Sequence, residues 1–107
     1  MVVTEETLTS KRAELIAWLR ASRKGWDENN VDTKLWPAKW AETHFVGTGR
    51  TIANEEFFNE AQKPLMEHPD GIFAMTEEGI EANLKALREV GIEGTREMFD
   101  TTLLDEI

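Results

Sequence analysis

The most regular alternation of apolar and polar residues runs from Ser10 to Trp26 and is typical of an amphipathic α-helix. Successive residues of an α-helix are about 100° apart, so the apolar residues fall on one side of this helix. This stripe, which includes one small polar residue, consists of Leu15, Ile16, Trp18, Leu19, Ser22 and Trp26. Arg20 and Lys24 fall on the opposite side. We therefore predict that this stripe is a core face on which the later helices pack.

Cap and turn residues set the expected limits of this helix. Thr4, Thr9 and Ser10 are candidate N-caps, and Asp27 to Asn30 favour turns, so the helix is expected to end or fade there. The segment Met1 to Val3 is predicted to be extended, either as a short strand or as a frayed arm.

The central part of the chain predicts two more helices. A short one includes Pro37 to Thr43, and the glycines in HFVGTGRT indicate a loop after it. A longer one begins near Thr51 and has a broad apolar stripe at Ile52, Phe57 or Phe58, Ala61, Leu65 and Met66. Pro64 is expected to kink or divide this helix, because proline lacks the backbone N–H group.

The last part predicts a helix that begins after the N-cap Thr76 and stops at Gly91. Its apolar residues are Ile80, Leu84, Leu87 and Val90. Asp100 can cap a terminal turn with Leu103, Leu104 and Ile107. The expected fold class is all-α (mainly α), with four to five helices, a short N-terminal extended segment and one helical domain over residues 1–107.

Charge and composition narrow the function. The 107 residues include 12 Lys and Arg and 21 Asp and Glu, for a net charge of −9. Such an acidic chain is expected to bind neither nucleic acid nor anionic membranes. The sequence has no cysteine, no apolar run long enough to cross a membrane and no export signal at MVVTEETL.

No residue pattern predicts catalysis, a metal or a cofactor. His44 and His68 are expected in surface loops, and the adjacent pairs Glu55–Glu56 and Glu77–Glu78 are expected to be solvated. The loop Gly47 to Thr51 runs into a helix N-terminus, so its backbone and Arg50 are a candidate anion site, although the loop lacks a Walker lysine. We therefore predict that the chain is not an enzyme.

Trp36 and Trp40 lie four residues apart and share one side of a short helix. They are expected to pack in the core, or alternatively to stack on a planar ligand or a partner protein.

The order of several segments resembles the C-terminal third of the NMT1/THI5-like solute-binding proteins of ABC importers. The resemblance runs from Val2 to Ile107 through TEETLTSKRAELIAWLRASRKGWDEN, GIFAMTEEGIEANLKALREVGI and MFDTTLLDEI. The matching positions are Leu15, Leu19, Arg20, Ala21, Gly25 and Trp26, a helix with Gln62 and Leu65, and then Gly91, Ile92, Phe99, Asp100, Leu103 and Leu104.

This resemblance implies the C-terminal part of a periplasmic-binding-protein type II fold, in a fragment or truncated form of the receptor. The family captures small organic solutes for a membrane permease, which implies a periplasmic location, or a cytoplasmic one for a chain without a signal peptide. No solute-binding residue follows from the matching positions. An exposed apolar face predicts a homo-oligomer, and the alternative function is a helical protein–protein interaction module without solute binding.

Overall fold

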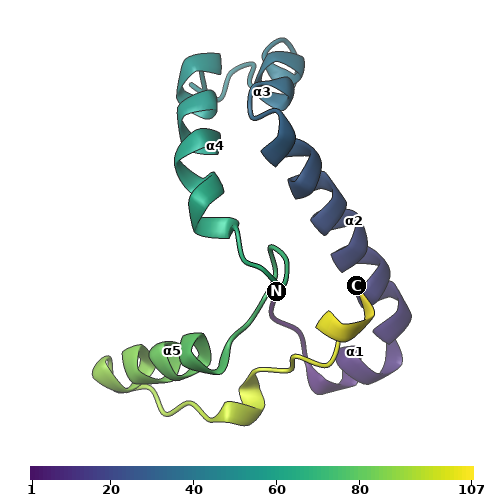
Figure 1. The fold of residues 1–107 in the computed structure, drawn as a ribbon, viewed down its shortest axis with the longest axis vertical. Helices are drawn as coiled ribbons and strands as arrows, with labels where there is room; N and C mark the ends of the chain where they lie inside the picture. The colour runs from purple at the N-terminus through teal and green to yellow at the C-terminus, as the bar shows by residue number, and fades with distance from the viewer. The chain divides into compact units, whose positions relative to one another are not determined.

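The computed structural model describes residues 1–107, and their order along the chain is shown in Figure 1. Five α-helices and two short 3-10 helices are present, without any β-strand: α1 (Glu5–Ser10), α2 (Arg12–Val31), α3 (Leu35–Trp40), α4 (Ile52–Met66), α5 (Glu77–Glu89), η1 (Arg96–Met98) and η2 (Leu104–Glu106). The all-α prediction with four to five helices is therefore confirmed. None of these helices combines the length and the apolar character needed to cross a membrane.

The chain divides into two compact units. The first unit consists of Met1–Ala17 and Phe73–Ile107, and the second consists of Trp18–Ile72. Helix α2 contributes residues to both. That the chain is a single domain stays a prediction.

The predicted N-terminal helix is in fact two helices. Thr4 caps α1 as expected, because its side-chain oxygen accepts a hydrogen bond from the N–H group of Thr7. The hydroxyl groups of Thr9 and Ser10 then donate to the carbonyl oxygens of Glu5 and Glu6, at 3.0 and 2.7 Å. Such bonds from side chain to backbone weaken a helix, and α2 begins after Lys11.

The C-terminus and the buried face of helix α2 also differ from those predicted. It continues through the turn-forming residues and ends at Val31, not near Trp26. Ile16 and Leu19 are buried as expected, whereas Trp18 is 55% exposed. Trp18 lies about 160° around the helix from Ile16, so both residues cannot belong to one narrow buried face.

The first unit buries its apolar residues around α5. Ile80 is fully buried, and Leu84 and Leu103 are nearly so. Helix α5 contacts η1, and a Cβ atom placed on Gly94 would meet Leu84 and Leu87 at 3.2 and 2.9 Å. The segment after α5 therefore packs closely against its apolar stripe.

The ends of α5 form as the sequence predicts. The Thr76 side chain accepts a hydrogen bond from the N–H group of Gly79. At the other end Gly91 has a φ of +77°, and the N–H groups of Gly91 and Ile92 donate to the carbonyl oxygens of Arg88 and Leu87. These two bonds define a Schellman motif, for which glycine is the favoured residue.

Polar contacts join distant segments of the first unit. Arg96 donates to both carboxylate oxygens of Glu77, at 3.0 and 2.6 Å, and this hydrogen bonding lowers the pKa of Glu77 below its usual value. Arg12 pairs with Glu106 at 2.5 Å. Asp100 accepts hydrogen bonds from the backbone and hydroxyl of Thr102, which lower the pKa of its carboxyl group.

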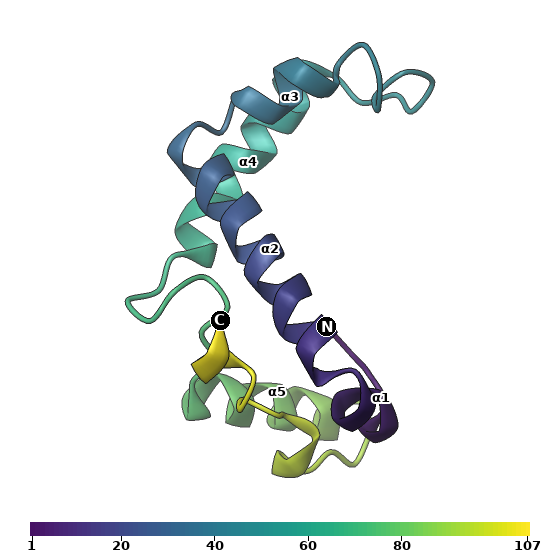
Figure 2. The same ribbon diagram turned by 90° about the vertical axis from the view of Figure 1, so that its right-hand side faces the viewer.

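The second unit contains α3 and α4, which contact each other, together with residues 18–31 of α2. A long connection of consecutive turns joins α3 to α4, as Figure 2 shows. Thr51 is the N-cap of α4, and the helix continues through Pro64 for two more residues, so Pro64 does not divide it.

The apolar stripe of α4 faces solvent, opposite to the arrangement expected of a core helix. Phe57, Phe58 and Ala61 are exposed, and Leu65 is 86% exposed. The residues on the more buried side are mostly polar, namely Glu55, Glu56, Asn59, Gln62, Lys63 and Met66. This reversal places hydrogen-bonding groups toward the rest of the second unit.

Candidate functional site

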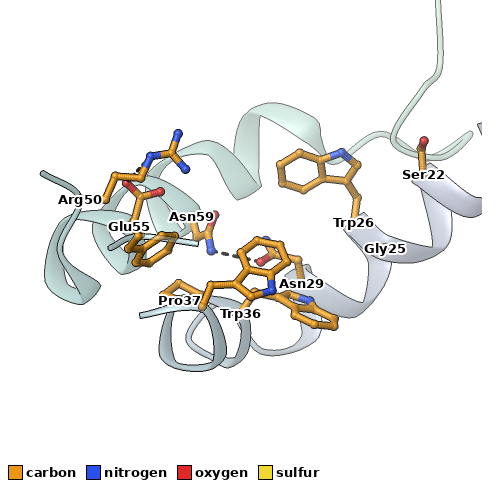
Figure 3. A pocket seen from close by; sticks show the side chains of 11 residues that line it. Ser22, Gly25, Trp26, Asn29, Trp36, Pro37, Arg50, Glu55 and Asn59 are labelled. Atoms are coloured by element: carbon orange, nitrogen blue, oxygen red, sulfur yellow. Dashed lines mark hydrogen bonds and ion pairs between the residues drawn. The ribbon is translucent and has the colours of Figure 1, made fainter. Parts of the chain in front are cut away.

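A pocket of about 410 Å³ lies entirely within the second unit. Figure 3 shows that α2, α3 and α4 contribute to its lining, with one end formed at the start of α4. The lining residues are Ser22, Gly25, Trp26 and Asn29 from α2, Trp36, Pro37 and Trp40 from α3, Phe45 and Arg50 from the connection, and Glu55 and Asn59 from α4.

Aromatic side chains make up much of the pocket lining. Trp36 and Trp40 are one helical turn apart on α3, and their rings lie 5.2 Å apart between centroids with a tilt of 31°. Lys39 lies over Trp36 at 4.8 Å, and Phe45 is buried. Trp26 approaches from α2 (Figure 3). Flat apolar surfaces of this kind stack favourably on planar rings.

The connection between α3 and α4 is shaped so that it supplies both Phe45 and Arg50. The N–H group of Phe45 donates to the carbonyl oxygen of Trp40, and the hydroxyl of Thr48 donates back to Phe45 at 2.7 Å. Gly47 and Gly49 have φ values of +74° and +76°, a region that residues with a Cβ atom rarely adopt. These turns reverse the chain beside the pocket.

Asn59 is the centre of a hydrogen-bond network between α4 and the end of α2. Its Nδ2 donates to Asn29 Oδ1 at 3.1 Å and to the Thr33 carbonyl oxygen at 3.0 Å. Its Oδ1 accepts a longer bond of 3.5 Å from Gln62 Nε2. Because a carbonyl oxygen can only accept, the Thr33 bond fixes which side of the Asn59 amide carries the nitrogen.

The same network leaves one buried donor unused. Asn29 must present its oxygen to Asn59, so its Nδ2 points elsewhere, and that atom is buried without a hydrogen-bond partner. Asn29 as a whole is only 6% exposed. A buried N–H group without a partner costs roughly 1–3 kcal/mol.

A charged pair lies at the α4 end of the pocket, as Figure 3 shows. Arg50 Nε is 3.8 Å from Glu55 Oε1, and the guanidinium carbon lies 5.9 Å from the centre of the Phe45 ring. The side chain of Glu55 is more buried than that of Arg50. The terminal nitrogens of Arg50 bond to no protein group, so they are available to a ligand.

The structure brings together residues that the sequence suggested separately. Trp36 and Trp40, the candidate ligand-stacking pair, and Arg50, the candidate anion-binding residue, line the same pocket. Trp26 belongs to this pocket rather than to a fully buried core. Asn29 and Asn59 were missed, and the only available signal was the presence of polar residues inside helical segments.

Of the other sequence candidates, Glu55 is not fully solvated as expected but lines the pocket, whereas the histidines and Glu77 lie outside it. Both histidines are exposed: His44 Nδ1 is 2.9 Å from the Thr43 hydroxyl, and His68 Nδ1 accepts a bond from the N–H group of Asp70. Glu77 pairs with Arg96 in the first unit. No three histidine, aspartate or glutamate side chains are grouped as metal ligands would be.

Comparison of the chain with models of protein families, with curated proteins and with solved structures gives no match.

Proposed function

We propose that this chain is a binding protein that holds a small organic molecule with a planar ring in the tryptophan-lined pocket. The observation that carries this proposal is an open space lined by Trp26, Trp36 and Trp40. A planar ring placed against these indole faces would gain dispersion and stacking contacts.

The size and chemistry of the pocket support this function. Pockets for small molecules usually measure about 300–1,000 Å³ and combine apolar walls with a few polar groups. The pocket here falls in that range at about 410 Å³. Asn29, Arg50 and Glu55 supply the few polar groups. A ring stacked on indole, with an acceptor near Arg50, would satisfy both kinds of surface.

Solute capture is also the role implied by the resemblance to the NMT1/THI5-like receptors. We propose this identity on the sequence motifs alone, and with it a family permease as partner and a periplasmic location. The pocket differs from the site of an intact receptor, because all its residues come from one unit of 55 residues, Trp18–Ile72.

The binding proposal predicts the effect of replacing Gly25 with Leu. A Cβ atom at Gly25 meets nothing within 4 Å, so the larger side chain begins in open space at the pocket lining. Leucine also favours the helix over glycine by roughly 0.7–1 kcal/mol. We expect the variant to keep its helical circular dichroism and to bind ring compounds at least about tenfold more weakly, a change of roughly 1.4 kcal/mol.

The measurement is a titration of one-ring and two-ring heteroaromatic compounds, followed by the indole N–H signals in two-dimensional NMR. Trp26, Trp36 and Trp40 are expected to shift together, and Trp18, which lies outside the pocket, serves as the internal control. Shifts at Trp18 alone, or equal binding by the Gly25→Leu variant, would contradict the proposal. Gly25→Ala is the matched control, since a single methyl group occupies little of the pocket.

A second proposal concerns association of the chain with a copy of itself. The sequence predicts a homo-oligomer formed through an exposed apolar face. In the structure the most exposed apolar residues that share one helix face are Phe57, Phe58, Ala61 and Leu65 on α4. Contiguous apolar surface of this kind is often covered by a protein partner, so we place the expected contact on this face of α4.

This proposal predicts a concentration-dependent dimer that is lost on replacing Leu65 with Glu. A charge placed on the buried side of such an interface is costly because it loses its water. The check is molar mass by light scattering behind size exclusion, where the unmodified chain should approach twice the monomer mass. Val31→Glu is the control, since Val31 is equally exposed but stands apart on α2. A monomer at all concentrations would refute the α4 contact.

A further inference from the structure

Taken together, the polar groups around the pocket point to the charge of its ligand, an inference that rests on the proposed binding function. We infer that the ligand is a planar aromatic anion, a ring that carries a carboxylate, with the ring among the tryptophans and the carboxylate on Arg50. The pocket lining holds one cationic side chain, Arg50, whose terminal nitrogens form no hydrogen bond with protein groups.

The accessible donors come from two sources, because Asn29 Nδ2 is buried beyond the reach of a ligand. The terminal nitrogens of Arg50 have no protein partner, since its contact with Glu55 uses Nε. The indole N–H groups of the three pocket tryptophans also form no hydrogen bond with protein groups. A ligand with several acceptor oxygens satisfies more of these donors than a neutral hydrocarbon or an amine does.

Glu55 is the one carboxylate in the lining, and its surroundings compensate its charge. It lies in the first turn of α4, where the helix dipole favours a negative group. It also has Arg50 at 3.8 Å. A guanidinium group carries five N–H donors along different edges. Arg50 can therefore keep its ion pair with Glu55 through Nε while its terminal nitrogens bind a ligand carboxylate.

The start of α4 adds to this preference. Arg50 comes two residues before α4, and Thr51 caps the helix with its side-chain oxygen. The positive end of the helix dipole and the guanidinium therefore lie at the same end of the pocket. The alternative is a cationic ligand, with an ammonium group enclosed by the aromatic rings beside Glu55. The positive charge of Arg50 would repel such a ligand, and the lining holds no carboxylate other than Glu55 to offset that repulsion.

The experiment compares three ligands that share one ring system and differ in charge. Naphthalene-2-carboxylate, naphthalene-2-carboxamide and 2-naphthylmethylammonium are titrated into the full chain by isothermal calorimetry. We expect the carboxylate to bind about tenfold more tightly than the amide and the ammonium compound to bind most weakly, because charge-assisted bonds to arginine exceed neutral ones.

Two variants assign the preference to Arg50. Arg50→Gln should remove the preference, so that the carboxylate and the amide bind equally. Lys39→Gln is the matched control, because Lys39 also lies over an aromatic ring but does not line the pocket. The Lys39→Gln variant should keep the preference of the unmodified chain for the carboxylate over the amide.

The outcomes separate this inference from the binding function. If all three compounds bind equally, or the ammonium compound binds best, the anion assignment is wrong and the binding function stands. If the carboxylate preference persists in Arg50→Gln, the carboxylate lies elsewhere and the assignment to Arg50 is wrong. If no compound binds, both proposals fail.

Discussion

Replacing Ile80 with Ala is expected to lower the free energy of unfolding by about 2–5 kcal/mol, the usual range for a buried isoleucine. Ile80 is fully buried, and it shares the α5 stripe with the nearly buried Leu84. The smaller side chain loses its apolar contacts and leaves a cavity that the surrounding residues fill only in part. The measurement is urea denaturation of the full chain, followed by circular dichroism.

Ile92→Ala provides a control of the same residue type near the end of the same helix. Ile92 is about half exposed, so its replacement should cost about 1 kcal/mol or less. Similar losses for the two variants would show that Ile80 is no more buried in solution than Ile92. That result would exclude the packing around α5 described above.

Replacing Asn59 with Ala is expected to destabilise the second unit by roughly 2–4 kcal/mol. The change removes the donor shared by Asn29 Oδ1 and the Thr33 carbonyl oxygen. Both acceptors belong to buried residues, and each acceptor left unpaired costs roughly 1–3 kcal/mol. Thermal unfolding followed by tryptophan fluorescence measures this loss, because the pocket tryptophans belong to the same unit.

Asn83→Ala is the corresponding control on α5. Asn83 donates one bond to the carbonyl oxygen of Gly79 at 2.8 Å, but it is exposed to water. Water replaces that bond, so the stability should change by about 0.5 kcal/mol or less. If Asn59→Ala lowers the stability by as little as Asn83→Ala does, the hydrogen-bond network between α2 and α4 contributes little to the stability of the second unit.

The local signals in the sequence account for much of the fold. Thr4, Thr51 and Thr76 each cap a helix through the side-chain oxygen, and Gly91 ends α5 in a Schellman motif. These features depend on a few neighbouring residues, so they can be recognised without knowledge of the tertiary structure. Another local feature is the turn at His68 to Gly71, which has a backbone hydrogen bond of 2.9 Å from Gly71 to His68.

Contacts between distant residues decide the features that were predicted wrongly. Asp27 to Asn30 favour turns locally, yet they remain helical, and Asn29 bonds to a residue 30 positions later. The same contact turns the polar side of α4 inward. A periodic pattern identifies an apolar stripe but does not show whether it is buried, so both the end of α2 and the orientation of α4 required the structure.

The candidate site was only partly predictable for the same reason. The two tryptophans on α3 and Arg50 drew attention by residue type and spacing, but ten positions separate Trp40 from Arg50. Only the folded connection, with its two glycines at positive φ, brings Arg50 to the pocket. Asn29 and Asn59 carry no motif, since their importance lies in a hydrogen bond between two helices.

Under the two binding proposals, the reversed polarity of α4 would give opposite faces of one helix to different partners, a copy of the chain and a small molecule. Substitutions at Phe57 or Leu65 would then alter self-association without touching the pocket. Changes at Glu55 would do the opposite. Among variants of this chain, selectivity for small molecules and self-association would therefore change independently, through residues on opposite faces of the same fifteen-residue helix.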